Sequence, residues 1–295
     1  IQGNNVDIVT TMPAIGDASK IVSGTTQITK SPDRLRIAEM TARFVKEAGS
    51  MHDGFSFQAG AGGTALSFAI FLMEMMREEG VKARFVRGGS TQYLVKMLEE
   101  GLTEHILDGQ TFDLEGVRSM RENPTHINTS PFTSYNYHGK GNFASMLDCV
   151  VLGATEVDVN FNANVVTHSD GYLLHGIGGW QNCLFSKCTI LPIPAFRDRI
   201  PVLVDEVTTR VGPGELIDVI VTERGIAINP LRDDLMEAVA GSDLPIRPIG
   251  EIKAEVDALV GGAPEKPNLG EEVVAAIEWV DGTVIDSVRK VLPKE

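Results

Sequence analysis

Three glycine-rich segments constrain the fold of this chain more strongly than any other feature of the sequence. They are Gly60-Ala61-Gly62-Gly63, Gly88-Gly89-Ser90-Thr91 and Gly176-Ile177-Gly178-Gly179. Each follows an apolar stretch that is typical of a β-strand, and the first two lead directly into a predicted helix. Glycine allows the backbone to approach a ligand closely, and the amides at a helix start are free to bind an anion. We therefore expect these turns to bind a phosphate group or a developing oxyanion.

The hydrophobic pattern around these segments alternates between strand and helix. Helices are predicted over residues 31–48, 65–79, 92–100 and 113–123, and strands over residues 54–58, 83–86, 105–107 and 149–153. Such alternation implies right-handed crossovers and a parallel sheet, with ligands bound at the carboxyl ends of the strands. We predict an α/β fold in which helices flank a mainly parallel sheet, with a C-terminal β-hairpin over residues 273–288.

The length of the chain bounds its domain organisation. Its 295 residues are 43% hydrophobic, which is enough for one large α/β domain or two small ones. The chain begins at Ile1, just before a predicted strand from Val6 to Thr10, so we expect a fragment that lacks an N-terminal half. The predicted organisation is a linker or strand over residues 1–30, an α/β domain over residues 31–245, and a helix, linker and hairpin over residues 246–295 that pack on it.

Charge and cysteine content disfavour several classes of function. A net charge of −14 argues against nucleic-acid binding, which requires a basic surface. No apolar run reaches the ~18 residues of a membrane helix, so we expect a soluble, cytoplasmic protein without membrane contact. The odd set Cys149, Cys183 and Cys188 indicates buried thiols in a reducing compartment. These cysteines lack a second Cys or His pair at zinc-site spacing, and no metal site is predicted.

Two polar stretches are further candidates for ligand binding. The segment from Thr125 to Asn142 is long, polar and aromatic, and we interpret it as a lid over the site rather than a mobile surface loop. Between Val157 and Val165, asparagines occupy every second position of an extended segment. Asparagine is a poor strand former, so this pattern indicates either a turn-rich edge or amides that face a ligand. The glycine segment that begins at Gly176 favours the second interpretation.

Five motifs, in order along the chain, carry a specific family resemblance. They are Gly54–Gly63, Val157–Val165, Arg199–Pro201, Asp218–Thr222 and Gly225–Pro230. Together they resemble the α subunits of bacterial citrate lyase, which belong to the coenzyme A transferase superfamily, and the resemblance extends over essentially the whole chain. It implies a coenzyme A transferase-like fold and the C-terminal half of a transferase. That enzyme exchanges acetyl for citryl on the thioester of an acyl carrier protein, within the citrate lyase complex.

The resemblance also implies a set of site residues. The expected oxyanion donors are the backbone amides of Gly178 and Gly179. The expected contacts of the acyl thioester or its pantetheine arm are Gly60, Gly62, Gly63, Gly88, Gly89, Ser90, Thr91, Asn162, Asn164 and Gly176. No tightly bound cofactor is implied, because the acyl group arrives on a phosphopantetheine-type group or on coenzyme A. The implied partners are the acyl carrier (γ) and citryl-lyase (β) subunits, citrate and acetate, and further copies of the chain.

One departure from the superfamily pattern affects the expected mechanism. Many coenzyme A transferases carry a nucleophilic glutamate after the second strand, where this chain reads Phe85-Val86-Arg87-Gly88-Gly89. We therefore expect direct attack of a citrate carboxylate on the acetyl thioester through a mixed anhydride, without a glutamyl thioester. Arg87 is the candidate partner for a citrate carboxylate, because a guanidinium offers a planar fork of donors. A surface salt bridge is the alternative role for this arginine.

Other functions also fit parts of the sequence. Gly60, Gly62 and Ala65 match a dinucleotide-binding spacing, and Arg87 is placed to accept the 2′-phosphate of NADP. The acidic residue that would bind a ribose is missing at the next strand end. A related transferase for citramalate or another small acid is a second alternative. A non-catalytic domain that binds NADP or a sugar phosphate is a third, because one fold can support many functions.

Overall fold

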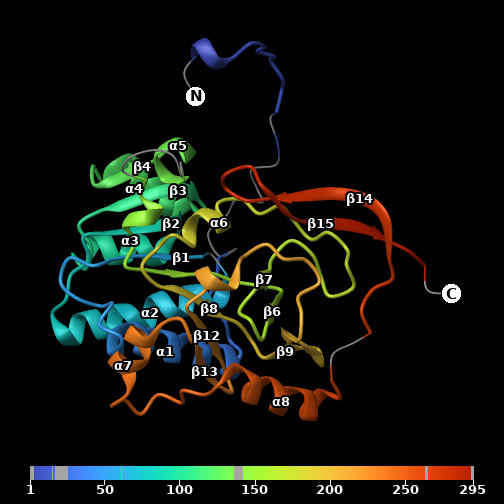
Figure 1. Cartoon of the computed structure of the whole chain (residues 1–295). Helices are drawn as coiled ribbons and strands as arrows, with labels where there is room; N and C mark the ends of the chain where they lie inside the picture. Colours follow the sequence, from blue (N-terminus) through green and yellow to red (C-terminus); the bar gives the residue numbers. More distant parts are fainter. Residues whose placement is uncertain are drawn as a thin grey trace.

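The computed structural model describes residues 3–14, 16, 26–60, 62–135, 142–262 and 265–293. Its centre is an eight-stranded sheet in the order β13-β12-β8-β5-β1-β2-β3-β4. These strands are β1 (Ser56–Ala59), β2 (Phe85–Ser90), β3 (Ile106–Thr111), β4 (His126–Asn128), β5 (Cys149–Val151), β8 (Thr189–Pro192), β12 (Val219–Thr222) and β13 (Gly225–Ile228). Every neighbouring pair is parallel except β12 with β13. The predicted mainly parallel sheet is thus confirmed (Figure 1).

The structure describes eight α-helices, and the first four begin within two residues of the positions that the sequence predicts. They are α1 (Pro32–Glu47), α2 (Gly63–Glu79), α3 (Gln92–Glu99), α4 (Leu114–Glu122), α5 (Pro131–Tyr135), α6 (Trp180–Cys183), α7 (Asp233–Val239) and α8 (Ile249–Val260). Asp113 caps α4, since its side chain accepts a hydrogen bond from the amide of Gly116. Within the described ranges, no helix combines the length and apolar character that a bilayer crossing requires.

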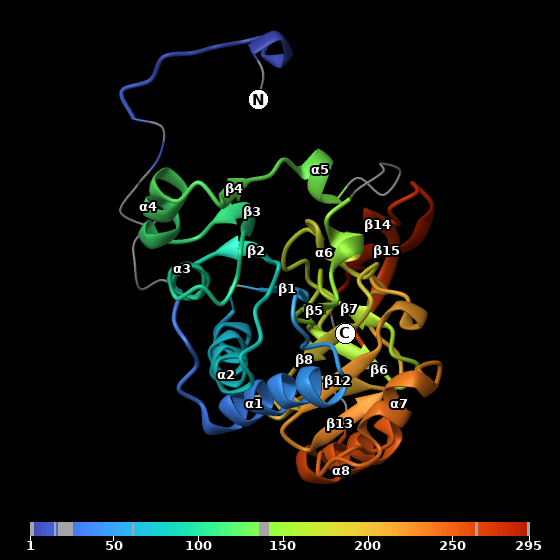
Figure 2. The ribbon, with the colours of Figure 1, turned by 90° about the vertical axis from the view of Figure 1, so that its left-hand side faces the viewer.

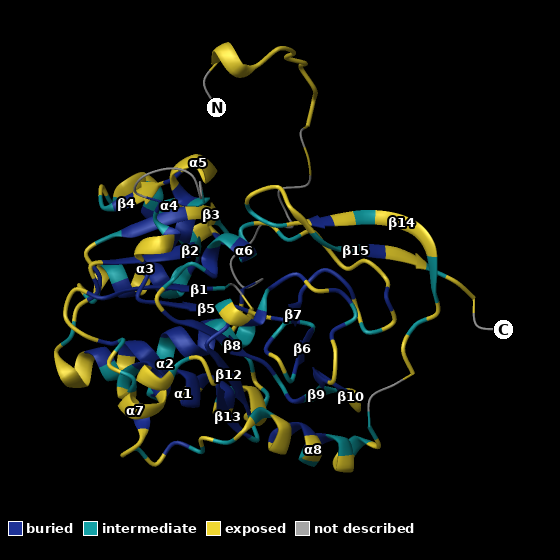
Figure 3. Ribbon diagram, viewed as in Figure 1, coloured by how far each residue is buried: buried dark blue, intermediate teal, exposed yellow. Residues whose placement is uncertain are grey.

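The two larger hydrophobic cores lie on opposite faces of the sheet, because successive side chains of a strand point to opposite faces. Val151 and Val219 belong to the core under α1, α2, α3 and α7, whereas Val150 and Ile220 belong to the other. Figure 2 shows α2 and α3 on one side of the central strands and the smaller sheets on the other. In Figure 3 most of the central strands are buried, whereas the end of β3 and most of β4 are not.

The second core is covered by short strands, α8 and a hairpin. These strands are β6 (Glu156–Asp158), β7 (Ala163–Asn164), β9 (Phe196–Arg197), β10 (Ile200–Pro201) and β11 (Leu203–Val204), and the hairpin is β14 (Leu269–Glu278) with β15 (Val284–Val291). Ile277 and Val288 of the hairpin and Ile252 of α8 are buried in this core. The predicted C-terminal hairpin is therefore present, and it packs on the second core.

Three local predictions are wrong. Residues 88–90 continue strand β2 instead of forming a turn. The segment before Gly176 is irregular, with a single bridge between Thr167 and Leu173, so the third glycine turn does not follow a strand. The described residues 3–14 contain a short 3-10 helix (Gly3–Asn5) and no strand at Val6 to Thr10. Within the predicted lid the structure forms β4 and α5, and residues 136–141 lie outside the described ranges.

A β-bulge at the carboxyl end of β3 determines the shape of the sheet edge. Gly88 pairs with Asp108 and Gly89 pairs with Gln110, so Gly109 is an extra residue on β3. Gly88 has a φ of +120°, and a Cβ at this position would lie 2.7 Å from the carbonyl oxygen of Ala59. Only glycine tolerates this conformation, and bulges often lie beside functional sites.

Candidate active site

Arg87 is the largest fully buried side chain in the described part of the protein. It extends from β2, and its Nη1 donates a hydrogen bond of 3.1 Å to Oε1 of Gln58 on the neighbouring strand β1. Its Nε and Nη2 have no hydrogen-bond partner among the described residues. These two nitrogens form one edge of the guanidinium, the edge that can bind a carboxylate in bidentate fashion.

The burial of Arg87 excludes the surface salt bridge that the sequence left open. Burying a charge without a partner is costly, so folding alone does not account for this arrangement. A carboxylate ligand would satisfy both free nitrogens. The burial therefore supports the prediction that Arg87 binds an anionic substrate.

Helices α5 and α6 bring further groups to Arg87. The ring of Tyr135, the last residue of α5, lies over the guanidinium with 4.6 Å between Cζ and the ring centroid. Gly179, directly before α6, packs against the same ring, since a Cβ there would lie 2.5 Å from Cζ of Tyr135. Nδ2 of Asn182 donates to the backbone oxygen of Tyr135 at 2.7 Å. The two helices thus meet at the carboxyl ends of β1 and β2.

Two titratable groups in this cluster remain neutral near pH 7. Burial raises the pKa of the Cys183 thiol to about 11, and the nearby Arg87 and the hydrogen bond from Gln58 only partly oppose this effect. Burial also raises the pKa of the Tyr135 hydroxyl, again partly opposed by Arg87. A protonated thiol is a poor nucleophile, whereas a protonated phenol can donate a hydrogen bond.

The first glycine segment provides an open helix start. Gly62 is the exposed N-cap of α2, and no side chain caps this helix. Because β1 pairs with β2 up to Ala59 and Gly88, the start of α2 lies on the same sheet edge as Arg87. An uncapped helix N-terminus attracts anions. The roles of Gly60 and Gly62 in thioester binding therefore stay predictions.

Gly63 has a packing role in addition to any contact with a ligand. A Cβ at this position would lie 3.1 Å from the backbone nitrogen of Thr29, whose amide donates to the carbonyl oxygen of Gly63. A side chain at this position would therefore press on residues 27–29, which cross the start of α2. Its predicted role in thioester binding rests on the family resemblance alone.

The second glycine segment does not offer a free helix start. The carboxylate of Asp113 already accepts the amide of Gln92 at 2.8 Å, at the beginning of α3. The Ser90 hydroxyl donates to Oδ2 of Asp108 at 2.6 Å, and a Cβ on Gly89 would overlap the ring of Phe112. Ser90 and its neighbour Thr91 are fully buried. For Gly88, Gly89 and Ser90 the structure thus gives packing and hydrogen-bonding roles, and we leave them out of the candidate site. The buried Thr91 hydroxyl has no hydrogen-bond partner among the described residues, and its contact with the thioester stays a prediction.

Asp108 connects the bulge to a buried polar network. Its carboxylate accepts hydrogen bonds from the hydroxyls of Ser90 and Thr111 and from the amide of Gln110, and it lies 3.4 Å from Nε2 of His126. Burial raises the pKa of Asp108, but the hydrogen bonds together outweigh burial and leave this pKa below its usual value.

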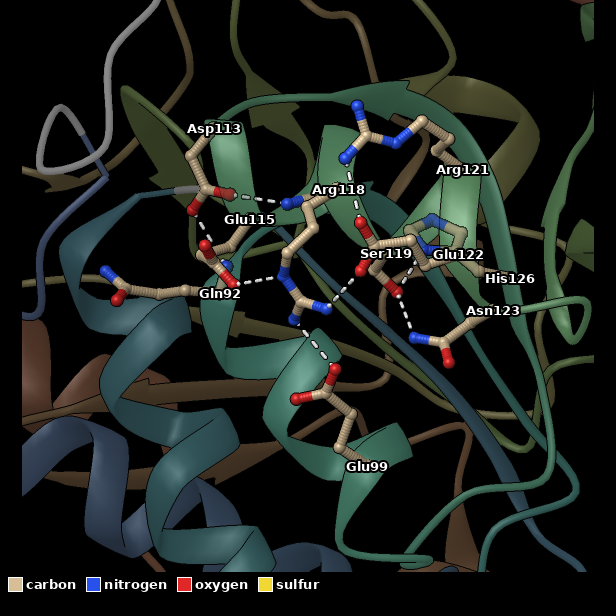
Figure 4. A network of polar contacts seen from close by, with 11 residues as sticks. Gln92, Glu99, Asp113, Glu115, Arg118, Ser119, Arg121, Glu122, Asn123 and His126 are labelled. Carbon is tan, nitrogen blue, oxygen red and sulfur yellow. Dashed lines mark hydrogen bonds and ion pairs between the residues drawn. The ribbon is translucent and has the colours of Figure 1, made fainter.

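The network continues onto the surface of α4. Nδ1 of His126 lies 2.9 Å from the Ser119 hydroxyl. Figure 4 shows this contact beside Arg118, which contacts the carboxylates of Glu99, Glu115 and Glu122. These contacts join α3, α4 and β4, which lie near the carboxyl end of β2, the strand that carries Arg87.

We expect the free energy of unfolding to fall at acidic pH through Asp108. Its pKa is lower in the folded protein than in the unfolded chain, where it is about 3.9. The ionised carboxylate therefore stabilises the fold above that value, and the contribution is lost as the pH falls through the folded pKa. Urea unfolding at pH 7 and pH 3 measures the change. Asp108→Asn should reduce the difference between the two pH values, and an unreduced difference would assign the effect to other groups.

The asparagines at Asn162 and Asn164 are occupied by internal hydrogen bonds. Asn164 is fully buried; its Nδ2 donates to Glu156 and Thr167, and its Oδ1 accepts two backbone amides. The side chain of Asn162 donates to Asp158 and accepts the amide of Gly214. These amides fasten the β6–β7 turn, so we leave both residues out of the candidate site.

The third glycine segment lies against the candidate site. The amides of Gly178 and Gly179 donate no hydrogen bond to the described residues. Gly179 also needs its lack of a side chain to accommodate Tyr135. Their expected role as oxyanion donors stays a prediction, as does thioester contact by Gly176, which is exposed.

A cavity of about 920 Å³ opens at a different place, beneath the C-terminal hairpin. Its lining includes Tyr172, Ile200, Asn268 and Leu292, and none of the predicted site residues. The guanidinium of Arg197, which borders it, already donates to the backbone oxygens of Ala154 and Thr155. Because none of the predicted site residues lines this cavity, we place the active site at Arg87.

Four residues of the candidate site were missed as ligand contacts by the sequence analysis. They are Gln58, Gly109, Tyr135 and Cys183. A glycine inside a predicted strand indicates a bulge, but the predicted strand ended at residue 107, so this signal did not apply to Gly109. The contacts between Gln58, Arg87 and Cys183 join residues far apart in the sequence, and a single sequence carries no signal for them.

Comparison with known proteins gives a consistent set of matches. A sequence profile of the family described as "Citrate lyase, alpha subunit (CitF)" matches residues 1–291. The citrate lyase alpha chain of Haemophilus influenzae is 39% identical over 292 residues, which cover 99% of this chain and 58% of that protein. The alpha chain of Escherichia coli K12 is 38% identical, with coverage of 99% and 57%. This chain thus spans little more than half the length of these relatives.

Solved structures agree with the sequence comparison. The putative alpha subunit of citrate lyase from Streptococcus mutans, solved in complex with citrate, gives a TM-score of 0.93 at 41% identity and covers 96% of this chain and 56% of that one. A Pseudomonas malonate decarboxylase hetero-tetramer gives a TM-score of 0.51 at 17% identity and shows the fold alone. The predicted coenzyme A transferase-like α/β fold is confirmed.

Proposed function

Because the chain belongs to the citrate lyase alpha subunit family, we propose that it exchanges acetyl for citryl on the thioester of an acyl carrier protein. Citrate replaces acetate in this reaction, and a separate lyase subunit then cleaves the citryl thioester. One observation carries the proposal: the buried guanidinium of Arg87 presents its free Nε–Nη2 edge at the carboxyl end of the central strands. The citrate named with the Streptococcus mutans relative is a molecule of the right chemistry for that edge.

The proposed route requires no covalent intermediate on the protein. A citrate carboxylate attacks the acetyl thioester carbonyl, which forms a mixed anhydride and frees the carrier thiolate. The thiolate then attacks the citryl carbonyl and releases acetate, so both bonds are exchanged without net change in charge. Arg87 holds a second, non-reacting carboxylate, and the amides of Gly178, Gly179 or the α2 start stabilise the oxyanion.

The residues around Arg87 support this direct route. Asp108 is the carboxylate beside the bulge, and its oxygens already accept several hydrogen bonds. A carboxylate that is stabilised in this way is a weak nucleophile. The Cys183 thiol is protonated near neutral pH for the reason given above. Neither side chain is suited to carry an acyl group.

We further propose the partners that this reaction requires. They are an acyl carrier subunit with a phosphopantetheine-type group, a citryl-lyase subunit, and further copies of this chain, in the cytoplasm. The thioester is a substrate, and no tightly bound cofactor takes part.

A mass measurement tests the function directly. The intact protein is incubated with acetyl-carrier and citrate, and the masses of carrier and protein are determined before and after. We expect the carrier to lose acetyl and gain citryl, only when citrate is present, while the mass of this chain stays constant. An acyl adduct on the chain would contradict the direct route, and an unchanged carrier would contradict the transferase. A fluorescence titration with NADPH tests the alternative function of dinucleotide binding, and we expect it to show no binding.

A further inference from the structure

The bulge at Gly109 opens a small space in front of Arg87. Gly109 is exposed, although its neighbours Leu107 and Asp108 in β3 are buried. A Cβ built on Gly109 would lie 3.6 Å from Nη2 of Arg87 and 3.8 Å from the hydroxyl oxygen of Tyr135. The Cβ position of this exposed glycine therefore lies at van der Waals distance from a guanidinium nitrogen, which is itself shielded from solvent, and from a phenolic hydroxyl.

The chemistry of these two groups defines what can bind there. The Nε and Nη2 of Arg87 are donors only, and the Tyr135 hydroxyl stays protonated because burial raises its pKa. A group that accepts several hydrogen bonds and carries a negative charge satisfies all three donors. The carboxylate of Asp108, the residue before Gly109, already accepts hydrogen bonds from Ser90, Thr111 and Gln110.

We propose that the space at Gly109 is the seat of a substrate carboxylate, held by the free edge of Arg87 and the hydroxyl of Tyr135. The identity of the acid as citrate rests on the proposed function. Gly109 is a glycine because a side chain would fill this seat. Tyr135 is a substrate-binding residue as well as the group that covers the guanidinium.

Two variants test the seat in different ways. Gly109→Ala adds a methyl group at ordinary van der Waals distances from Arg87 and Tyr135, and the φ of this glycine is not in the left-handed region, so the unliganded fold accommodates it. The methyl group nevertheless occupies the seat. Tyr135→Phe keeps the ring over Arg87 and removes only the donor. We expect each variant to weaken citrate binding about 10-fold or more, since a hydrogen bond to a charged group contributes that much.

Isothermal titration of the intact protein measures the effect, with thermal unfolding as a check on the fold. The titrants are citrate and tricarballylate, which is citrate without its hydroxyl. Gly241→Ala and Tyr172→Phe are matched controls, because Gly241 has open space around it and Tyr172 is exposed. We expect Gly109→Ala and Tyr135→Phe to weaken both acids equally, with unchanged melting temperatures and unchanged binding in the controls.

The possible outcomes distinguish a failure of the proposed carboxylate site at Gly109 from a failure of the proposed function. Unchanged affinity in Gly109→Ala or in Tyr135→Phe would overturn the seat. A loss restricted to citrate would also overturn it, since Tyr135 would then contact the substrate hydroxyl instead of a carboxylate. If the wild-type protein binds acetate or succinate but neither tricarboxylate, and Gly109→Ala abolishes that binding, the seat stands and the citrate function fails. Binding of no carboxylate at all would overturn both.

Discussion

Replacing Arg87 with methionine should lower kcat/KM for citrate about 30- to 1,000-fold and leave the melting temperature unchanged or higher. The loss of activity follows from the loss of a charge-assisted pair with a substrate carboxylate, which is worth roughly 2–4 kcal/mol. The effect on stability has the opposite sign. Arg87 is fully buried with two unpaired nitrogens, so an apolar side chain of similar length removes an uncompensated charge from the interior.

Two further variants make this result specific. Arg87→Lys keeps the charge but not the planar fork, so we expect it to recover only a small part of the activity. Arg84→Met is the matched control, because Arg84 lies three residues earlier in the chain and is exposed. Steady-state exchange kinetics and calorimetry give both readouts. An Arg87→Met protein that retains activity but melts at a lower temperature would show that the arginine is structural.

The regular part of the fold could be predicted because its signals are local. Ser31 and Pro32 indicate the start of α1, and Asp113 indicates the start of α4, through capping preferences that act within one helical turn. The glycines at 88 and 89 gave a false signal. They are required by a left-handed φ beside Ala59 and by the ring of Phe112, which are contacts between neighbouring strands and not the geometry of a turn.

The candidate site was predictable only at Arg87 and in the first and third glycine segments. Arg87 could be singled out because many members of the superfamily carry a glutamate after the second strand, and this chain has an arginine in that region. Its burial, and its contacts with Gln58 and Tyr135, depend on the register of β1 with β2 and on the position of α5. Those are long-range properties, and periodicity along one chain does not encode them.

Replacing Asn164 with alanine should destabilise the protein by roughly 3–5 kcal/mol and leave the KM for citrate unchanged. Asn164 is fully buried, and its side chain satisfies the carboxylate of Glu156, the hydroxyl of Thr167 and the amides of Val166 and Thr167. Removing it leaves the two backbone amides without a partner in a low-dielectric interior, where each unsatisfied group is costly. Glu156 and the Thr167 hydroxyl each lose one partner and keep Thr208 and Thr209, respectively. Urea unfolding at pH 7 measures the loss.

The alternating asparagines provide a control within the same segment. Asn160 shares the period that suggested a ligand-facing row, but it is exposed, so Asn160→Ala should change stability by less than about 0.5 kcal/mol. Asn162→Ala should fall between the two, because its side chain is only partly buried and contacts Asp158 and Gly214. This graded series is expected if the amides fasten the β6–β7 turn. A row of ligand contacts would instead raise KM in the Asn162 and Asn164 variants at nearly constant stability, because ligand contacts add little to the fold of the free protein.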